Sequence, residues 1–166
     1  MAPRRILAWG GHGFRGPASD RAICDYMAGL LDRERPRVCL LPTASGDPAD
    51  QIARFHNAFA ERGCESSDIT LFRLAGRPVA LRDHLLSQDL IYVGGGSMVN
   101  LLAIWEALDI AAILRLAWER GVVLAGQSAG AMCWFEAGIT KSSGAPAPRR
   151  GGGWRRCHGP PRSRAG

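Results

Sequence analysis

Short apolar runs alternate along residues 1–140 with longer segments in which apolar residues recur every three or four positions. Continuous apolar runs of four to eight residues are typical of strands buried on both faces of a parallel sheet, and the three-to-four-residue repeat is typical of amphipathic helices. The pattern therefore predicts five strands separated by helices. The predicted strands span residues 5–9, 37–41, 69–74, 90–93 and 121–125.

The predicted helices lie between these strands. They span residues 19–34, a segment opening at Asp47 and Pro48 and ending before Gly63, residues 79–86, and one broken helix or two over 98–108 and 109–119. Strands that alternate with helices predict an α/β fold with a mainly parallel sheet and helices on both faces. Ligands of such sheets bind at the carboxyl ends of the strands, where this chain has three glycine-rich turns.

The turn after the fifth strand carries the sharpest motif. Residues 126–130 read Gly-Gln-Ser-Ala-Gly, which fits the G-x-S-x-G nucleophile elbow with Ser128 at its apex. The residues two before and two after the apex come close together, so they must be small, and backbone N–H groups beyond the turn can stabilise an oxyanion. The alternative interpretation is a tight strand-to-helix turn with a passive serine.

The other two glycine turns follow the fourth and first strands. Gly94, Gly95 and Gly96 can bring backbone N–H groups close to a ligand, as the other half of an oxyanion hole, or can simply keep a crowded loop small. Residues 11–16 fit G-x-G-x-x-G, but a dinucleotide site also needs an acid at the end of the second strand, and none occurs before Asp47. We therefore expect no dinucleotide site there.

Charge divides the chain at residue 140. The net charge is +6, of which residues 141–166 contribute +7, so that residues 1–140 carry −1. We expect residues 1–140 to form one α/β domain and 141–166, rich in Arg, Gly and Pro, to be a disordered tail. A basic tail can bind nucleic acid, but Trp154 is its only large apolar residue, and we interpret it as a terminus without that role.

Composition excludes several classes of protein. A hydrophobic content of 46% excludes a disordered or fibrous chain, and no apolar run is long enough to span a bilayer or to form a secretory signal. The five cysteines include no CxxC pair, so neither a disulfide framework nor a zinc site is indicated. The spacing of His12, His56 and His84 also suggests no metal site, and a cytoplasmic location is expected.

Three segments together resemble the peptidase E family of serine peptidases, which includes dipeptidase E and cyanophycinase-like proteins. They are residues 37–46, residues 91–97 with their Gly-Gly-Gly-Ser turn together with residues 100–102, and residues 124–131. The resemblance implies a class I glutamine amidotransferase-like fold and a hydrolase acting on short peptides, in some members aspartyl dipeptides, with no metal or organic cofactor. It implies that Ser128 attacks the scissile carbonyl, while the N–H of Ala129 and one from Gly95 or Gly96 hold the oxyanion.

The chain also departs from the family. Family members are longer, with a base histidine well after the elbow, whereas the family-like sequence here stops near Thr140 and only His158 follows. Lys141 stands where relatives tend to carry an acid, and Glu136, in a predicted helix, is assigned no role.

These departures lead us to expect a truncated or frame-shifted, nearly inert peptidase, because a serine without a base is a weak nucleophile. The alternative function is a non-catalytic module that binds an anion or an amino acid. A small peptide is the expected partner, with no membrane or nucleic acid, and the oligomeric state is left open.

Overall fold

The computed structural model describes residues 3–11, 13–15, 19–72, 80–140 and 155–158. Its strands are β1 (Ile6–Trp9), β2 (Arg37–Leu41), β3 (Glu65–Asp68), β4 (Leu90–Val93), β5 (Val123–Gln127), β6 (Ala137–Thr140) and β7 (Arg155–His158). Its α-helices are α1 (Ser19–Gly29), α2 (Ala49–Ala60), α3 (Leu81–Leu86), α4 (Met98–Ala107), α5 (Ile110–Glu119) and α6 (Ala129–Met132). Two short 3₁₀ turns, η1 (Gly13–Arg15) and η2 (Thr43–Ser45), follow β1 and β2.

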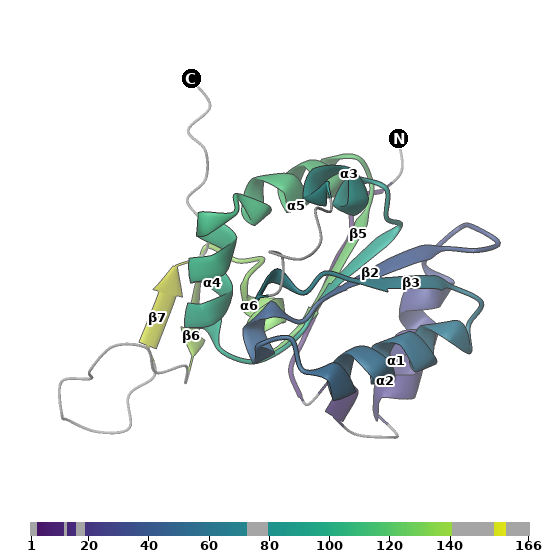
Figure 1. The fold of residues 1–166 in the computed structure, drawn as a ribbon, viewed down its shortest axis with the longest axis horizontal. Coiled ribbons are helices and arrows are strands. Elements are labelled where there is room, and N and C mark those ends of the chain that lie inside the picture. Colours follow the sequence, from purple (N-terminus) through teal and green to yellow (C-terminus); the bar gives the residue numbers. More distant parts are fainter. Residues whose placement is uncertain (1–2, 12, 16–18, 73–79, 141–154, 159–166) are drawn as a thin grey trace.

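The first five strands form one sheet in the order β1-β5-β4-β2-β3, and every neighbouring pair is parallel. Figure 1 shows this sheet with α1 and α2 on one side and α3 and α5 on the other. The α/β fold with a mainly parallel sheet, predicted from the hydrophobic pattern, is confirmed. All the turns that leave the carboxyl ends of these strands therefore lie at one edge of the sheet.

Alternation along the central strands builds a core on each face of the sheet. Along β2, Val38 and Leu40 pack in the cluster that contains Phe55 of α2, while Cys39 and Leu41 pack in the cluster on the opposite face. β4 and β5 divide their side chains in the same way. Each fully buried leucine or valine contributes about 1.5–3 kcal/mol, so burial of both faces specifies the register of these strands.

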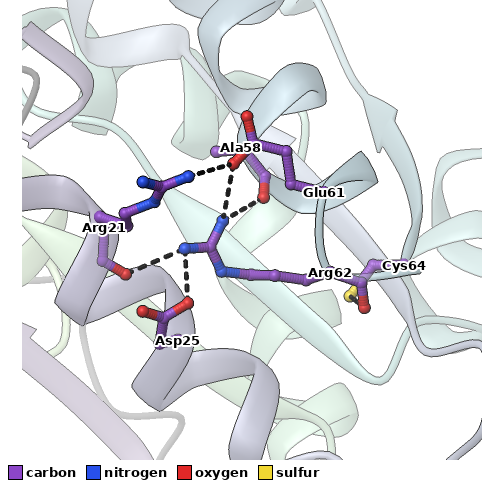
Figure 2. A network of polar contacts seen from close by, with 6 residues as sticks. All are labelled: Arg21, Asp25, Ala58, Glu61, Arg62 and Cys64. Carbon is purple, nitrogen blue, oxygen red and sulfur yellow. Dashed lines mark hydrogen bonds and ion pairs between the residues drawn. The ribbon is translucent and has the colours of Figure 1, made fainter.

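A polar network joins the two helices on the α1 and α2 face (Figure 2). The guanidinium of Arg62, just after α2, donates from Nη2 to Asp25 Oδ1 at 2.6 Å and to the Arg21 carbonyl at 3.1 Å, and from Nη1 to the Ala58 carbonyl. The Arg62 side chain is only 10% exposed, whereas Asp25 is 64% exposed. The ion pair itself is therefore screened, and the carbonyl contacts of the buried guanidinium fix α2 against α1.

Two predicted strands lie elsewhere along the chain than expected. β3 covers residues 65–68 instead of the apolar stretch 69–74, whose Ile69 and Leu71 are buried beyond the strand's end. An edge strand can be polar because one of its sides has no strand to pair with, and hydropathy therefore misplaced it. β5 runs from Val123 to Gln127, two residues later than predicted, because it extends alongside β1 as far as Gln127.

Two predicted helices are shorter than their sequence patterns indicate. α1 ends at Gly29, and α6 ends at Met132 instead of continuing through Glu136. Glu136 lies between α6 and β6 and is exposed.

Within the basic tail the structure describes residues 155–158, and the expectation that residues 141–166 form a disordered tail stays a prediction. Residues 155–158 form β7, which pairs antiparallel with β6 so that His158 stands opposite Ala137. The backbone pairing of β7 with β6 is what the structure describes of this segment. The other tail residues lie outside the described part of the chain. No helix in the described ranges is long and apolar enough to cross a membrane.

Candidate active site

Ser128 lies at an abrupt turn between β5 and α6, where Figure 1 shows the strand running directly into the short helix. Its backbone has φ 55° and ψ −115°, a region that non-glycine residues rarely occupy. Ser128 is exposed, while Gln127 and Ala129 on either side are buried. A strained apex that presents one side chain to solvent is the geometry that the G-x-S-x-G motif requires.

Hydrogen bonds on both sides hold Ser128 in this conformation. Its N–H donates to the Trp9 carbonyl at 3.0 Å, which extends the β1–β5 pairing to the apex. Its carbonyl accepts from the N–H groups of Ala131 and Met132, both at 3.0 Å. Backbone strain of this kind costs about 1–3 kcal/mol and persists where the surroundings over-determine it.

The two motif glycines are required by close backbone contacts. A Cβ on Gly126 would lie 2.0 Å from the carbonyl oxygen of Gly130. A Cβ on Gly130 would lie 2.0 Å from the carbonyl oxygen of Val93, at the end of β4. Both contacts are with backbone atoms, which cannot rotate away, so the turn excludes any side chain at these positions.

The glycine turn after β4 lies beside Ser128. A Cβ on Gly95 would be 3.0 Å from Ser128 Cβ, and one on Gly96 would be 2.1 Å from the Ala44 carbonyl oxygen of η2. The N–H of Ser97 donates to that same carbonyl at 2.7 Å, which fixes the turn against η2. Two sequence-distant turns that were expected to form one site are thus adjacent.

Three backbone N–H groups in the turns around Ser128 have no hydrogen-bond acceptor among the described residues. Within the described residues, the N–H groups of Gly95, Gly96 and Ala129 donate no hydrogen bond, whereas that of Gly94 donates to the Leu41 carbonyl at 3.0 Å. α6 is only four residues long, so its dipole adds little. Any oxyanion here would be stabilised by individual N–H groups, not by a helix end.

Gln127 is a component of this site that the motif search did not single out. Its side chain is buried, and Nε2 donates to the Gly11 carbonyl in the turn after β1. A Cβ on either Gly13 or Gly95 would lie 2.6 Å from Gln127 Oε1. The Gln127 amide therefore occupies the space between the first and fourth strand turns. Sequence reasoning missed Gln127 because it occupies a variable position of G-x-S-x-G, where the motif specifies no residue type.

Gly13 consequently has a packing role that the G-x-G-x-x-G pattern does not describe. Gly13 has φ 57°, and a Cβ there would contact Gln127 Oε1 and, at 2.9 Å, the Tyr92 hydroxyl. A glycine is needed because the turn is pressed against the elbow. His12 lies outside the described residues. Among those described, no three His, Cys, Asp or Glu side chains are grouped to hold a metal ion.

The described histidine side chains are hydrogen-bonded away from the elbow. His56 contacts Ser66 and Asp68, and His84 contacts Ser67, all of which lie on β3 at the far edge of the sheet from β1. For His158 the structure describes only the backbone, which pairs with Ala137 in the β6–β7 ladder. Among the histidine side chains that the structure describes, none is therefore bonded to Ser128.

Cys133 follows α6 and is close to the motif, but it is not suited to act as a nucleophile. Its Sγ contacts the Gly130 carbonyl oxygen at 3.1 Å, and burial raises its pKa well above the ordinary thiol value. The thiolate is the reactive form of cysteine, so this thiol is inert near neutral pH. Cys133 packs behind the elbow, and Ser128 is left as the exposed hydroxyl at the turn.

Comparisons with known proteins agree on the family. The sequence model of peptidase family S51 matches residues 6–154, a span that continues past Thr140 into the basic tail. The chain is 43% identical over 141 residues to the uncharacterized peptidase YgaJ of Bacillus subtilis strain 168, an alignment that covers 85% of this chain and 60% of YgaJ.

Two solved structures share the fold. A candidate peptidase E protein from Listeria monocytogenes EGD-e aligns with a TM-score of 0.57 and 17% identity, over 76% of this chain and 61% of that one. A peptidase from an acI-B1 Actinobacterium aligns with a TM-score of 0.61 and 19% identity, over 84% and 61% of the two chains. The chain thus spans about 60% of the length of these relatives. With the family match covering most of its length, the chain belongs to peptidase family S51.

Proposed function

We propose that this chain carries the nucleophile and oxyanion site of a serine peptidase that hydrolyses short peptides. Ser128 attacks the scissile carbonyl, and the N–H of Ala129 with that of Gly95 or Gly96 holds the resulting oxyanion. The observation that carries this proposal is the strained backbone of Ser128 at an exposed apex, with the Gly95 turn so close that a Cβ on Gly95 would lie 3.0 Å from Ser128 Cβ. Pre-aligned, unpaired N–H groups stabilise developing negative charge without reorganising, which is a large term in acyl transfer.

The preferred substrates in this proposal are aspartyl dipeptides, as the resemblance to peptidase E implies. We expect turnover by the 166-residue chain to be slow. A serine hydroxyl needs a proton acceptor, and the described histidines His56 and His84 are engaged on β3. Catalysis without a triad base typically retains only about 10³–10⁴-fold acceleration over water.

A non-catalytic module that binds an anion or an amino acid is the second candidate. The observation that favours it is the combination of unpaired N–H groups around Ser128 with the absence of a bonded histidine among the described side chains. Convergent N–H groups bind carboxylates and phosphates whether or not a nucleophile is active.

A fluorophosphonate probe distinguishes the two functions, because a serine held beside an oxyanion site attacks its phosphorus and a passive serine does not, so that slow labelling is expected even without a triad base. We expect labelling on the peptide that contains Ser128, its loss in Ser128→Ala, and its retention in Ser87→Ala, a matched control at the C-terminal end of α3. Cleavage of an aspartyl dipeptide should follow the same pattern. An unlabelled Ser128 in a chain that binds phosphate or aspartate by calorimetry would refute the peptidase proposal and support the binding module.

His158 is tested in the same assay. If His158→Ala abolishes both labelling and hydrolysis, the base is present in the tail and the expectation of slow turnover is wrong. If His158→Ala leaves the labelling rate unchanged, the tail does not supply the base.

A further inference from the structure

A second serine, histidine and aspartate are hydrogen-bonded in sequence at the opposite edge of the sheet. His56 of α2 lies over β3, with its Nδ1 2.7 Å from Ser66 Oγ and its Nε2 2.9 Å from Asp68 Oδ1. β2 and β4 separate β3 from β5, which carries the Ser128 turn. This cluster of Ser66, His56 and Asp68 is therefore independent of the peptidase site, and nothing argued below rests on the reaction proposed for Ser128.

The two hydrogen bonds together assign the proton on the His56 ring. A carboxylate can only accept, so His56 Nε2 carries the hydrogen that bonds to Asp68. In the neutral ring Nδ1 is then the acceptor, and the Ser66 hydroxyl donates to it. A serine that donates to a histidine whose other nitrogen is held by a carboxylate has the arrangement that activates serine nucleophiles, here with the roles of the two ring nitrogens exchanged.

The cluster is accessible to small molecules. The side chains of His56 and Asp68 are 33% and 27% exposed, and Ser66 is partly exposed. Glu65 and Ile69 direct their N–H groups inward to carbonyls of Pro36 and Leu40 at 2.8 and 3.0 Å. Because N–H directions alternate along a strand, the N–H of Ser66 points to the outer edge of β3, where the described residues provide no further strand.

Ser67 provides a comparison within the same strand. Its Oγ lies 3.0 Å from His84 Nε2 on the opposite face of the sheet, and it also donates to the Val38 carbonyl at 3.4 Å. No carboxylate is hydrogen-bonded to His84 among the described residues, and burial, with a smaller contribution from Arg37, lowers its pKa. Ser67 thus contacts a histidine whose pKa is lowered from its ordinary value and to which no described carboxylate is hydrogen-bonded.

We infer that Ser66 is an acyl-accepting nucleophile, activated by His56 and Asp68, that reacts with small activated esters. Ser66 Oγ attacks the ester carbonyl carbon while its proton passes to His56 Nδ1, and Asp68 stabilises the resulting imidazolium. The alkoxide or phenolate leaves, so one ester bond breaks and the ester bond to Ser66 forms. The outward N–H of Ser66 is positioned to stabilise the intermediate oxyanion, and no cofactor or redox partner is required.

The test uses the full chain with Ser128→Ala, so that the elbow serine cannot react, and p-nitrophenyl acetate as the acyl donor. Trypsin releases residues 63–73 as one peptide, and fragment ions distinguish acetylation of Ser66 from that of Ser67. We expect Ser66 to be acetylated at least about 10-fold faster than Ser67. His56→Gln, which retains an amide in place of the imidazole but supplies no base, should lower the Ser66 rate by about 100-fold or more.

Asp68→Asn supplies a readout that a structural role would not produce. An amide at this position donates to Nε2 and moves the ring hydrogen to Nδ1, so the Ser66 rate should fall although the packing is preserved. His84→Gln is the matched control and should leave the Ser66 rate unchanged. Thermal unfolding of each variant verifies folding. Equal acetylation of Ser66 and Ser67, or an unchanged Ser66 rate in folded His56→Gln, would overturn the inference.

Discussion

Replacing Gly130 by alanine tests how α6 is packed against the end of β4. The added Cβ would lie 2.0 Å from the Val93 carbonyl oxygen, 2.6 Å from its carbonyl carbon and 2.8 Å from the Gly94 carbonyl oxygen. Ordinary carbon–oxygen contacts exceed 3 Å. The helix and the strand end must therefore separate by about 1 Å, and neither can relax by rotating a side chain.

Overpacking in a core typically costs about 1–3 kcal/mol, and the rigid backbone on both sides of this contact places Gly130→Ala at the upper end, near 3 kcal/mol. In a chain of this size, 1 kcal/mol corresponds to a shift of about 2–4 °C in the unfolding midpoint. We therefore expect Gly130→Ala to lower the midpoint by about 6–12 °C. Urea unfolding followed by tryptophan fluorescence should show a lower midpoint with an unchanged slope.

Gly29→Ala is the matched control. Gly29 is the last residue of α1, and a Cβ there would meet no atom within 4 Å. It should be neutral or stabilising by up to about 1 kcal/mol, because alanine restricts the unfolded chain. If Gly130→Ala unfolds within about 0.5 kcal/mol of the parent chain, α6 does not pack on β4 as described, and the geometric reason for the second motif glycine is wrong.

Three further predictions concern other residues. Gln127→Leu keeps the side-chain volume but removes the hydrogen bond to the Gly11 carbonyl. It should slow fluorophosphonate labelling of Ser128 about 5–10-fold with little change in the unfolding midpoint. An unchanged labelling rate would exclude a positioning role for the Gln127 amide. The pKa of His84 is lowered in the folded chain, so near and below about pH 6.5 the unfolded chain binds more protons than the folded chain. The free energy of unfolding should therefore fall as the pH drops from 7.5 to 5. His84→Gln should show a weaker pH dependence of the urea midpoint. Burial raises the pKa of Cys39 to about 12, so iodoacetamide should alkylate it only after unfolding, and modification of the native protein at the rate of a free thiol would contradict its burial.

The sequence by itself determined the parts of the fold that depend on burial on both faces. β2 and β4 coincide with their predicted ranges because a strand at the centre of a parallel sheet is covered on both faces, so that consecutive positions are apolar and only Arg37, at the start of β2, is charged. The first glycine of G-x-S-x-G was likewise readable, because a Cβ on Gly126 would lie 2.0 Å from the carbonyl oxygen of Gly130, only four residues along the chain. Local rules were sufficient wherever the physical requirement acted within a few residues.

Only the tertiary structure decided where partners from distant segments meet. The edge strand β3 was misplaced, because its Ser66 and Asp68 are polar in sequence and acquire their partner, His56, only when α2 packs over them. The position of the Gln127 side chain between two glycine turns also depends on a distant segment, because its hydrogen-bond acceptor, the Gly11 carbonyl, is 116 residues away in the sequence. A side chain whose hydrogen bonds are completed by remote backbone leaves no periodic signal, because its energy depends on a contact that exists only after folding.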